Sequence, residues 1–265
     1  MKELTAQELK TTELNILIAF REFCDSNGIK YYFTGGTLLG AVRHGGFIPW
    51  DDDIDVVMPR PDYELFLKKF PSDERYKIIT YRNNKDYKFP YAKMIDSNTV
   101  LKEQIIRSVN GMGAFIDIFP LDGLGDSEEV AKSNVRKARK YLLYENYCIN
   151  RFAFNKGLRY FLLNFRILYS FVTSRLYFNA IEKLGAKYSF DDSLYVGCIF
   201  GYNNEREVLE RSIFENSIEM EFEKERFKVP IGYKAYLTSF YDDYMKLPPE
   251  EKRVTHHSFK VYWKE

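Results

Sequence analysis

The chain has 265 residues, of which 45% are hydrophobic and 29% charged, and its formal net charge is +1 at pH 7. A sequence of this size and composition can bury a substantial core, either as one large domain or as a domain with a helical addition. The near-neutral charge excludes a general nucleic-acid binder, which would be strongly basic.

The first ten residues and the spacing of the cysteines bear on the cellular compartment in which the protein is expected. Residues 1–10 contain no apolar segment of a secretory signal, and no uncharged apolar run approaches the length of a membrane span. Cys24, Cys148 and Cys198 are widely spaced and form no CxxC motif, which argues against a disulfide framework and a zinc site. We therefore expect a cytoplasmic protein.

The first predicted element is an amphipathic helix with recognisable ends. Thr5 and Glu8 have the spacing of a capping box at its start, and Gly28 is a typical C-terminal stop. Apolar residues between them recur at helical spacing, so we expect this helix to cover one face of a sheet.

Two glycines follow the next predicted strand. Residues 29–33 are apolar and aromatic apart from Lys30, which favours a buried strand, and residues 37–42 favour a short helix. Gly35 and Gly36 therefore stand at a strand-to-helix turn, where a helix N-terminus offers free N–H groups to an anion. This stretch predicts a phosphate site.

An acidic run comes next and leads into a strand over residues 54–58. Asp53 and Asp55 are two residues apart, so their carboxylates leave the same face of that strand and repel each other unless a cation lies between them. Such an oxygen site suits Mg²⁺ or Mn²⁺. A calcium loop fits poorly, because Val56 occupies the required glycine position and Asp62 the position of the bidentate Glu.

The following stretch predicts a helix over 61–70 and strands over 76–81 and 91–95. Lys93 alternates with apolar neighbours in the last of these strands. A solvated surface charge is the ordinary interpretation of a single lysine, and the residues alone leave it open against a functional role.

Asp117 lies at the centre of the apolar strand predicted over 115–119. An aspartate there is costly unless a charged partner meets it, and the metal held by Asp53 and Asp55 is the simplest partner. An ion pair with Arg43 or a capping role is the alternative. Asp122, in the following Pro-Leu-Asp-Gly sequence, is predicted to belong to a turn.

Residues 126–187 show long helical patterns with twelve Lys and Arg against five Asp and Glu, interleaved with aromatic residues. We favour a helical subdomain that packs aromatic faces onto the catalytic sheet. The alternative is a basic aromatic surface that rests on the anionic cytoplasmic membrane leaflet.

The final part returns to mixed structure, with a strand pair over 218–222 and 227–229 and a Tyr-rich helix over 232–245. His256 and His257 are adjacent, so they cannot both face one ligand from a regular element, and a two-His metal site is not expected.

Four segments carry a resemblance to a known family. Residues 35–44 and 47–55 are similar to the signature of the LicD family of phosphocholine transferases, and residues 115–122 and 230–257 also match it. The resemblance implies a nucleotidyltransferase-like fold, shared with the fukutin-related polyol-phosphate transferases. It also implies a CDP-alcohol donor, most simply CDP-choline, from which CMP leaves while the phospho-alcohol is joined to a hydroxyl of a glycan acceptor.

The expected fold is accordingly α+β (α/β): a mixed, mostly antiparallel sheet flanked by helices, with a helical insertion. We predict a catalytic core over 1–125, a helical insertion over 126–190 and a C-terminal part over 191–265 that completes the active site. No internal repeat or linker argues for independent domains.

The predicted site has three parts. Asp53, Asp55 and Asp117 would serve as catalytic residues and hold one or two Mg²⁺ or Mn²⁺ ions. The donor phosphates would meet a second group, which comprises Gly35, Gly36, Thr37, Arg43 and, by the resemblance, Lys93. The resemblance also suggests that the C-terminal tail returns to the active site, where Arg253 or His256 would touch phosphate.

The residues alone predict phosphoryl or nucleotidyl transfer, and the choice between them depends on the resemblance. A nucleotidyltransferase acting on a small molecule or sugar phosphate is one alternative, and a binding protein on an inactive catalytic fold is another. The resemblance further implies that the acceptor is a lipopolysaccharide or teichoic acid precursor carried on lipid at the cytoplasmic membrane face.

Overall fold

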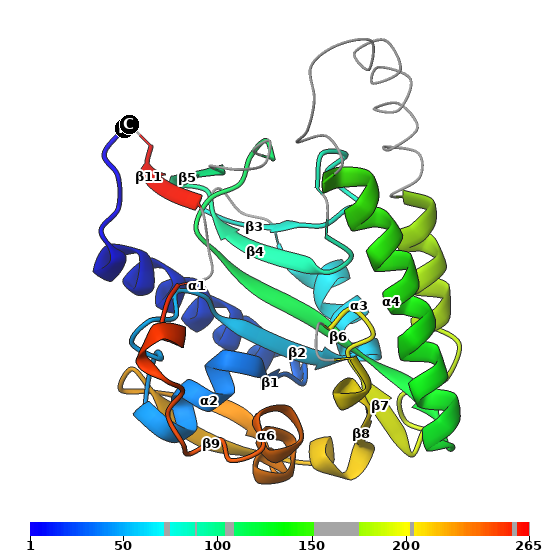
Figure 1. The fold of residues 1–265 in the computed structure, drawn as a ribbon. Helices are drawn as coiled ribbons and strands as arrows, with labels where there is room; N and C mark the ends of the chain where they lie inside the picture. The colour runs from blue at the N-terminus through cyan, green and yellow to red at the C-terminus, as the bar shows by residue number, and fades with distance from the viewer. Residues whose placement is uncertain are drawn as a thin grey trace. The chain divides into compact units, whose positions relative to one another are not determined.

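The computed structural model describes residues 1–71, 75–87, 89–103, 109–150, 175–201, 204–255 and 259–264, without the side chains of 143–150 and 204. The chain forms two compact units (Figure 1), one of Met1–Leu121 with Arg211–Glu265 and the other of Asp122–Glu210. We describe each unit by itself. The boundaries predicted at residues 125 and 190 remain a prediction.

The first unit is organised around a mixed sheet whose strands follow the order β1-β2-β6-β4-β3. Strands β2 and β6 pair in parallel, and the other neighbours in this order pair antiparallel. The predicted mixed, mostly antiparallel sheet is confirmed. The strands are β1 (Tyr32–Phe33), β2 (Asp55–Pro59), β3 (Tyr76–Ile79), β4 (Ala92–Asp96) and β6 (Phe115–Gly125).

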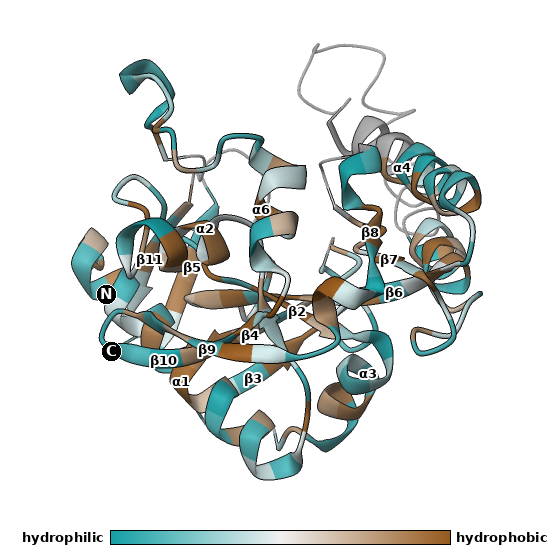
Figure 2. Cartoon of the chain, turned by 90° about the horizontal axis from the view of Figure 1, so that it is seen from below, coloured by the Kyte–Doolittle hydropathy of each residue, from teal (hydrophilic) through white to brown (hydrophobic). Residues whose placement is uncertain are grey.

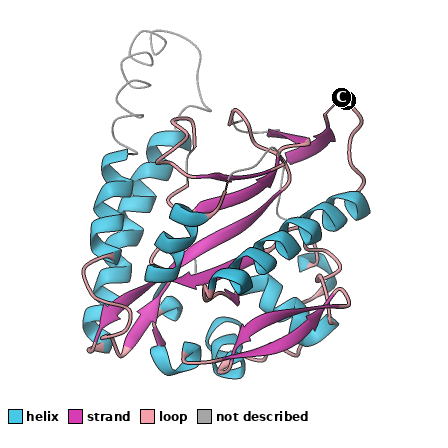
Figure 3. Cartoon of the chain, turned by 180° about the vertical axis from the view of Figure 1, so that it is seen from behind, coloured by secondary structure: helices cyan, strands magenta, loops and turns pink. Residues whose placement is uncertain are grey.

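Helices α1 (Ala6–Asn27) and α3 (Arg60–Lys69) pack on this sheet, α1 against β4 and α3 against β2. In the view from behind, α1 lies across the strands (Figure 3). Both helices carry hydrophilic and hydrophobic residues (Figure 2). Their apolar faces meet through aromatic rings, since Phe20 and Phe66 have ring centroids 5.1 Å apart. Burial of such rings supplies much of the stability of a core.

Both predicted ends of α1 are confirmed. The Thr5 hydroxyl accepts a hydrogen bond from the Glu8 N–H at 3.2 Å, and the Glu8 carboxylate accepts one from the Thr5 N–H at 2.8 Å. Gly28 ends the helix with φ of 65°, a left-handed conformation that glycine adopts without strain.

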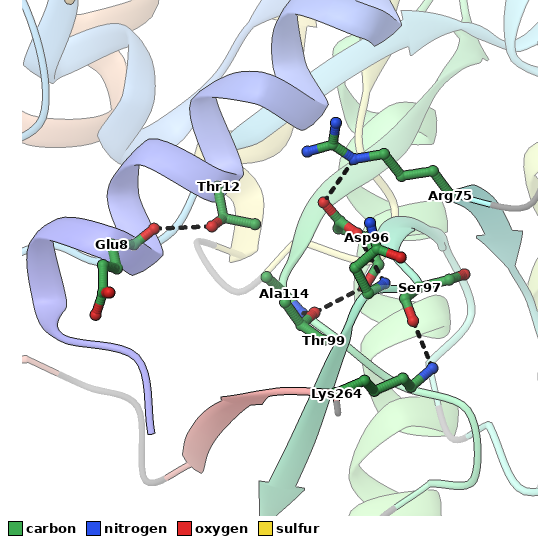
Figure 4. Close-up of polar contacts among 9 residues, drawn as sticks. Glu8, Thr12, Arg75, Asp96, Ser97, Thr99, Ala114 and Lys264 are labelled. Atoms are coloured by element: carbon green, nitrogen blue, oxygen red, sulfur yellow. Dashed lines mark hydrogen bonds and ion pairs between the residues drawn. The ribbon is translucent and has the colours of Figure 1, made fainter. Parts of the chain in front are cut away.

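The turn between β4 and β5 (Thr99–Glu103) is tied to its surroundings by polar contacts (Figure 4). The Thr99 hydroxyl donates to the Asp96 carbonyl at 2.7 Å and accepts from the Ala114 N–H at 2.8 Å, while Arg75 Nε lies 3.1 Å from the Asp96 carboxylate. Strand β5 pairs antiparallel with β11 (Phe259–Trp263), the last strand of the chain, a pairing that the sequence did not suggest.

The remaining elements of this unit surround α2 (Gly35–His44), which contacts β2, β9 and α6. The predicted strand pair is confirmed as the antiparallel hairpin of β9 (Ser217–Phe222) and β10 (Glu225–Pro230), and the Tyr-rich helix as α6 (Tyr233–Tyr241). Short 3₁₀ helices occupy Arg211–Phe214 and Glu250–Lys252.

The second unit begins within β6, which continues where a turn was predicted. Asp122 is fully buried in this strand and lies opposite Gly197 of β7 (Tyr195–Gly197), so the predicted turn is wrong. Strand β6 continues past this point because its pairing partner changes. Leu121 is the last residue of β6 that pairs with β2, and Asp122 is the first that pairs with β7.

The rest of the second unit contains α4 (Glu128–Asn150), a helical segment over 175–185, a 3₁₀ helix over Asn204–Glu207 and β8 (Leu209–Glu210). Most of the described part of the predicted helical stretch is therefore helical, and its residues 151–174 lie outside the described part of the chain. No helix among the described residues is both long and apolar enough to cross a lipid bilayer.

Candidate active site

The predicted glycine turn forms the first turn of α2. Both glycines lie inside the helix, which begins at Gly35 rather than at Thr37 as expected. Gly35 has φ of 53°, and a Cβ atom there would lie 3.1 Å from Asp55 Oδ2. At Gly36 the distance to Asp51 Oδ2 would be 2.5 Å. Glycine is thus required because the helix start lies directly on two carboxylates.

Thr37 has a structural contact in addition to the phosphate-binding role predicted for it, which remains a prediction. Its hydroxyl accepts a hydrogen bond from the Asp55 N–H at 2.8 Å, so this side chain connects α2 to the first residue of β2. A hydroxyl that accepts one hydrogen bond still has its own proton to donate, so Thr37 can offer donor phosphate this O–H as well as a backbone N–H at the helix start.

Tyr236 of α6 also reaches this helix start, which the sequence did not predict. Its hydroxyl accepts a hydrogen bond from the Gly35 N–H at 3.1 Å and shares one of 2.5 Å with the Thr34 hydroxyl. The side chain is buried, and its ring stacks on Phe240 with centroids 4.3 Å apart. A contact between residues so distant in sequence leaves no local pattern to detect.

The central charges lie side by side on three neighbouring strands. Asp55 of β2 lies opposite Asp117 of β6 in the parallel pairing, and Asp117 lies opposite Lys93 of β4 in the antiparallel one. Lys93 and Asp117 form an ion pair and are only 4% and 7% exposed. The surface interpretation of Lys93 is therefore wrong, and the partner of Asp117 is Lys93 rather than Arg43.

Asp55 lies in a strongly negative environment. Burial raises the pKa of its carboxyl well above the usual value, the charges of Asp53, Asp117 and Asp51 raise that pKa further, and Lys93 lowers it. Carboxylates gathered in this way hold their charge only when a cation neutralises them. The one lysine supplies part of that neutralisation, and its ammonium is directed to Asp117.

The chemistry of these groups fits a divalent cation. Carboxylate oxygens are the ligands that Mg²⁺ prefers, and Asp55 and Asp117 face each other across adjacent strands. As the side chains stand in the described part of the chain, no group of three or more His, Cys, Asp or Glu residues is arranged to hold a metal ion. The ligand set of Asp53, Asp55 and Asp117 remains a prediction.

Arg43, near the end of α2, has no carboxylate partner among the described residues. Its Nη1 donates to the Tyr244 carbonyl at 3.0 Å, and its Nε donates to Nε2 of His44 at 3.0 Å. Burial lowers the pKa of the Arg43 guanidinium; nearby Tyr241 raises it, and Arg253 lowers it. A guanidinium in this situation is suited to bind an anionic group.

The C-terminal segment returns to the loop before β2, in line with the predicted direction of the tail. The guanidinium of Arg253 lies over the Trp50 ring, 5.5 Å from its centroid, while its Nε donates to the Pro248 carbonyl at 2.9 Å. The Thr255 hydroxyl donates to the Trp50 carbonyl at 3.1 Å. The predicted contact of His256 falls on a residue outside the described part of the chain.

Glu13 of α1 is a further acidic side chain near the site. It is 1% exposed, and its Oε2 atom has no hydrogen-bond partner among the described residues. Burial raises the pKa of this carboxyl well above its usual value, and the charges of Asp53 and Asp52 add to the increase. In the sequence Glu13 is one polar residue in an amphipathic helix, so no signal distinguished it.

Comparisons with known proteins agree with this picture. Residues 28–149 match the family described as LicD/FKTN/FKRP, nucleotidyltransferase domain. The lipopolysaccharide cholinephosphotransferase LicD of Haemophilus influenzae is 34% identical over 269 aligned residues, which cover 99% of each chain.

Human ribitol 5-phosphate transferase FKRP is 53% identical over 32 residues, 12% of this chain and 6% of that protein. Yeast mannosyltransferase regulator 4 is 33% identical over 64 residues, 24% of this chain and 5% of that protein. These likenesses are partial, whereas the likeness to the Haemophilus protein extends over the whole chain. The chain belongs to the LicD family.

Proposed function

We propose that this protein is a phosphotransferase that moves phosphocholine, or a related phospho-alcohol, from a CDP-alcohol donor to a hydroxyl of a cell-surface glycan. The observation that supports this best is the row of Asp55, Asp117 and Lys93 beneath the glycine turn, in a chain similar over its full length to a lipopolysaccharide cholinephosphotransferase. The first unit would then be a nucleotidyltransferase-like domain.

The glycine turn and the carboxylates have complementary roles in this proposal. The N–H groups at the start of α2 would bind donor phosphate, although the carboxylates of Asp51 and Asp55 lie beside them and would repel it. A divalent cation held by Asp53, Asp55 and Asp117 would neutralise that repulsion and the charge on the departing nucleotide. Phosphate binding and cation binding are therefore expected to depend on each other.

The reaction would be an in-line displacement. The acceptor hydroxyl oxygen forms a bond to the phosphorus that bears the alcohol, the bond from that phosphorus to the bridging oxygen of CMP breaks, and CMP leaves with the electron pair. Asp117 is the candidate to accept the hydroxyl proton. Lys93, Arg43 and Arg253 would hold the donor phosphates by charge-assisted hydrogen bonds, with His256 as a further candidate.

Product analysis tests the proposal. Purified protein is incubated with CDP-choline, Mg²⁺ and a lipopolysaccharide acceptor, and we expect CMP release with choline phosphate on the glycan. Pyrophosphate release from a nucleoside triphosphate would instead support nucleotidyl transfer, the activity that the family description suggests as a second candidate. Asp53→Ala should abolish turnover with the fold intact, and an active variant would contradict the assignment.

The identity of the alcohol can be screened before an acceptor is known. A donor that binds the folded state raises the unfolding temperature, so a series of CDP-alcohols with and without Mg²⁺ should reveal the preferred one. We expect the largest shift from CDP-choline with Mg²⁺ present. A shift that is independent of Mg²⁺ would contradict the coupled phosphate and cation sites.

The acceptor would be a lipopolysaccharide or teichoic acid precursor carried on lipid, which brings the enzyme to the cytoplasmic membrane face. The basic and aromatic residues of the 126–190 stretch are the candidates for that contact, as the alternative to the favoured interpretation of a helical subdomain packed on the sheet. Sedimentation with anionic liposomes tests this part separately, and failure to bind them in the absence of acceptor would remove it.

A further inference from the structure

A row of aromatic rings borders the central charges of the first unit. Phe89, Tyr91 and Phe119 follow one another, with ring centroids 5.4 Å apart between Phe89 and Tyr91 and 4.3 Å apart between Tyr91 and Phe119. Tyr91 is buried, whereas Phe89 and Phe119 are half-buried. The two outer rings therefore keep part of their surface available for a ligand.

Strand geometry places this row next to the acidic pair. Phe119 is two residues beyond Asp117 on β6, so both side chains leave the same face of the strand, about 7 Å apart along it. Tyr91 comes immediately before β4, two residues ahead of Lys93, which lies opposite Asp117. The rings therefore stand one step along the sheet from the carboxylates.

These rings already contact a cation. The Lys93 ammonium lies 5.1 Å from the centroid of Phe89 and 5.6 Å from that of Tyr91, and it lies closest to Phe115, at 3.5 Å on the other side of Asp117. Aromatic faces turned towards an ammonium provide the negative potential that any cation in this position would meet. Lys93 lies closest to Phe115, whereas Phe119 stands two residues beyond Asp117 in the opposite direction along β6.

We propose that Phe89, Tyr91 and Phe119 form the subsite for the quaternary ammonium of the transferred alcohol and make the enzyme select choline over neutral polyols. This inference rests on the proposed function, because it identifies the alcohol that the same site accepts. A trimethylammonium group donates no hydrogen bond, so aromatic faces and nearby carboxylates are the groups that recognise it. A two-carbon spacer joins it to the phosphate, so it lies near the ring row when the phosphate lies over the carboxylates.

The charges nearby favour this occupant. Asp117 lies two residues from Phe119 on the same face of β6, so a cation seated against that ring remains close to a carboxylate. A neutral polyol such as glycerol or ribitol would gain nothing from this potential and would lack hydrogen-bond partners on the phenylalanine rings.

The test compares donors in matched variants. For Phe119→Leu we expect the ratio of kcat/KM for CDP-choline to that for CDP-glycerol to fall about tenfold, while Phe119→Tyr restores it. Phe115→Leu is the matched control: it removes the ring against Lys93, so it should lower kcat/KM for both donors and leave the ratio unchanged. Equal losses for the two donors in Phe119→Leu would overturn the subsite.

A binding measurement separates this inference from the proposed function. If the wild-type protein turns over neither donor, the proposed function fails, and calorimetric titration with phosphocholine and glycerol phosphate still tests the rings. Tighter binding of phosphocholine that is lost in Phe119→Leu would support the subsite. Equal binding of the two compounds, or binding of neither, would overturn it.

Discussion

Strands β2, β6 and β4 carry charged side chains on one face of the sheet and apolar side chains on the other, because consecutive residues of each strand point to opposite faces. One face presents Asp55, Asp117 and Lys93, and the adjacent positions on the other face present Val56, Ile118 and Ala92, all fully buried. A shift of one residue thus separates the charges from the core. Burial on one face supplies the free energy that a row of charges on the other consumes.

Among substitutions on the two faces of the sheet, we expect Asp55→Asn to lower activity most. The substitution removes the carboxylate with the strongly raised pKa, and we expect kcat/KM to fall at least about a thousandfold while the unfolding temperature at pH 8 stays the same or rises. Asp52→Asn, in the same acidic run but outside the predicted ligand set, is the matched control. A clear loss of stability in Asp55→Asn would show that this charge contributes to the fold.

Lys93→Met should affect stability most strongly. It leaves the buried Asp117 without its counter-ion, and urea unfolding should show a loss of about 3–5 kcal/mol. The double variant Lys93→Met/Asp117→Asn replaces both charges of this ion pair by neutral side chains, so most of that loss should be regained. Additive losses from the two substitutions would mean that the pair is not coupled.

Glu13 departs from the pattern of charged side chains on one side of the sheet and apolar side chains on the other. It is a buried acid on α1, the helix that packs against β4. Its raised pKa means that the folded state keeps a proton that the unfolded state loses above pH 4.5 or so. Stability should therefore fall as pH rises from that point towards the folded pKa, by about 1.4 kcal/mol per pH unit. Glu13→Gln should remove this slope, measured by urea unfolding at several pH values.

Glu8, on the same helix, provides a control of opposite sign. Its hydrogen bonds, chiefly the one from the Thr5 backbone, lower its pKa to about 2, so its contribution to stability is present above the ordinary value and is lost as pH falls. Glu8→Gln should therefore change the acid side of the pH profile. A Glu13→Gln profile parallel to that of the wild type would contradict the assignment of the slope to Glu13.

The smallest expected effect belongs to the apolar face. Ile118→Val removes one methylene from a fully buried position and should cost about 1 kcal/mol in unfolding free energy. Because the side chain points away from the charges, kcat of the folded enzyme should not change. A lower kcat under conditions where all of the variant is folded would show that packing on the apolar face affects the charged residues on the other face.

Local signals in the sequence were sufficient for the elements that make up the site. Thr5, Glu8 and Gly28 mark the ends of α1, and the apolar run after the acidic residues predicted the strand that forms as β2. This strand begins at Asp55, so Asp53 lies before it, and the shared strand face predicted for the two carboxylates remains a prediction. Alternation likewise placed Asp117 and Lys93 within strands, and their pairing followed once those strands were adjacent. These inferences depended on patterns within a few residues.

The features that escaped prediction depend on residues far apart in sequence. Nothing near Tyr236 indicates that its hydroxyl meets Gly35, and nothing near β5 indicates that the last strand pairs with it. Asp122 shows the converse error: a Pro-Leu-Asp-Gly sequence is typical of a turn, yet a new strand partner carries β6 through it. Tertiary pairing overrides local preference in such places.

The parallel pairing of β2 with β6 affects how the chain folds. Strands β3, β4 and β5 lie between them in the chain, so Asp55 and Asp117 meet only after all of these have been synthesised and folded back. A pairing between strands so far apart in the sequence closes a long loop, so it is expected to form late in folding, and the two carboxylates come together only with it.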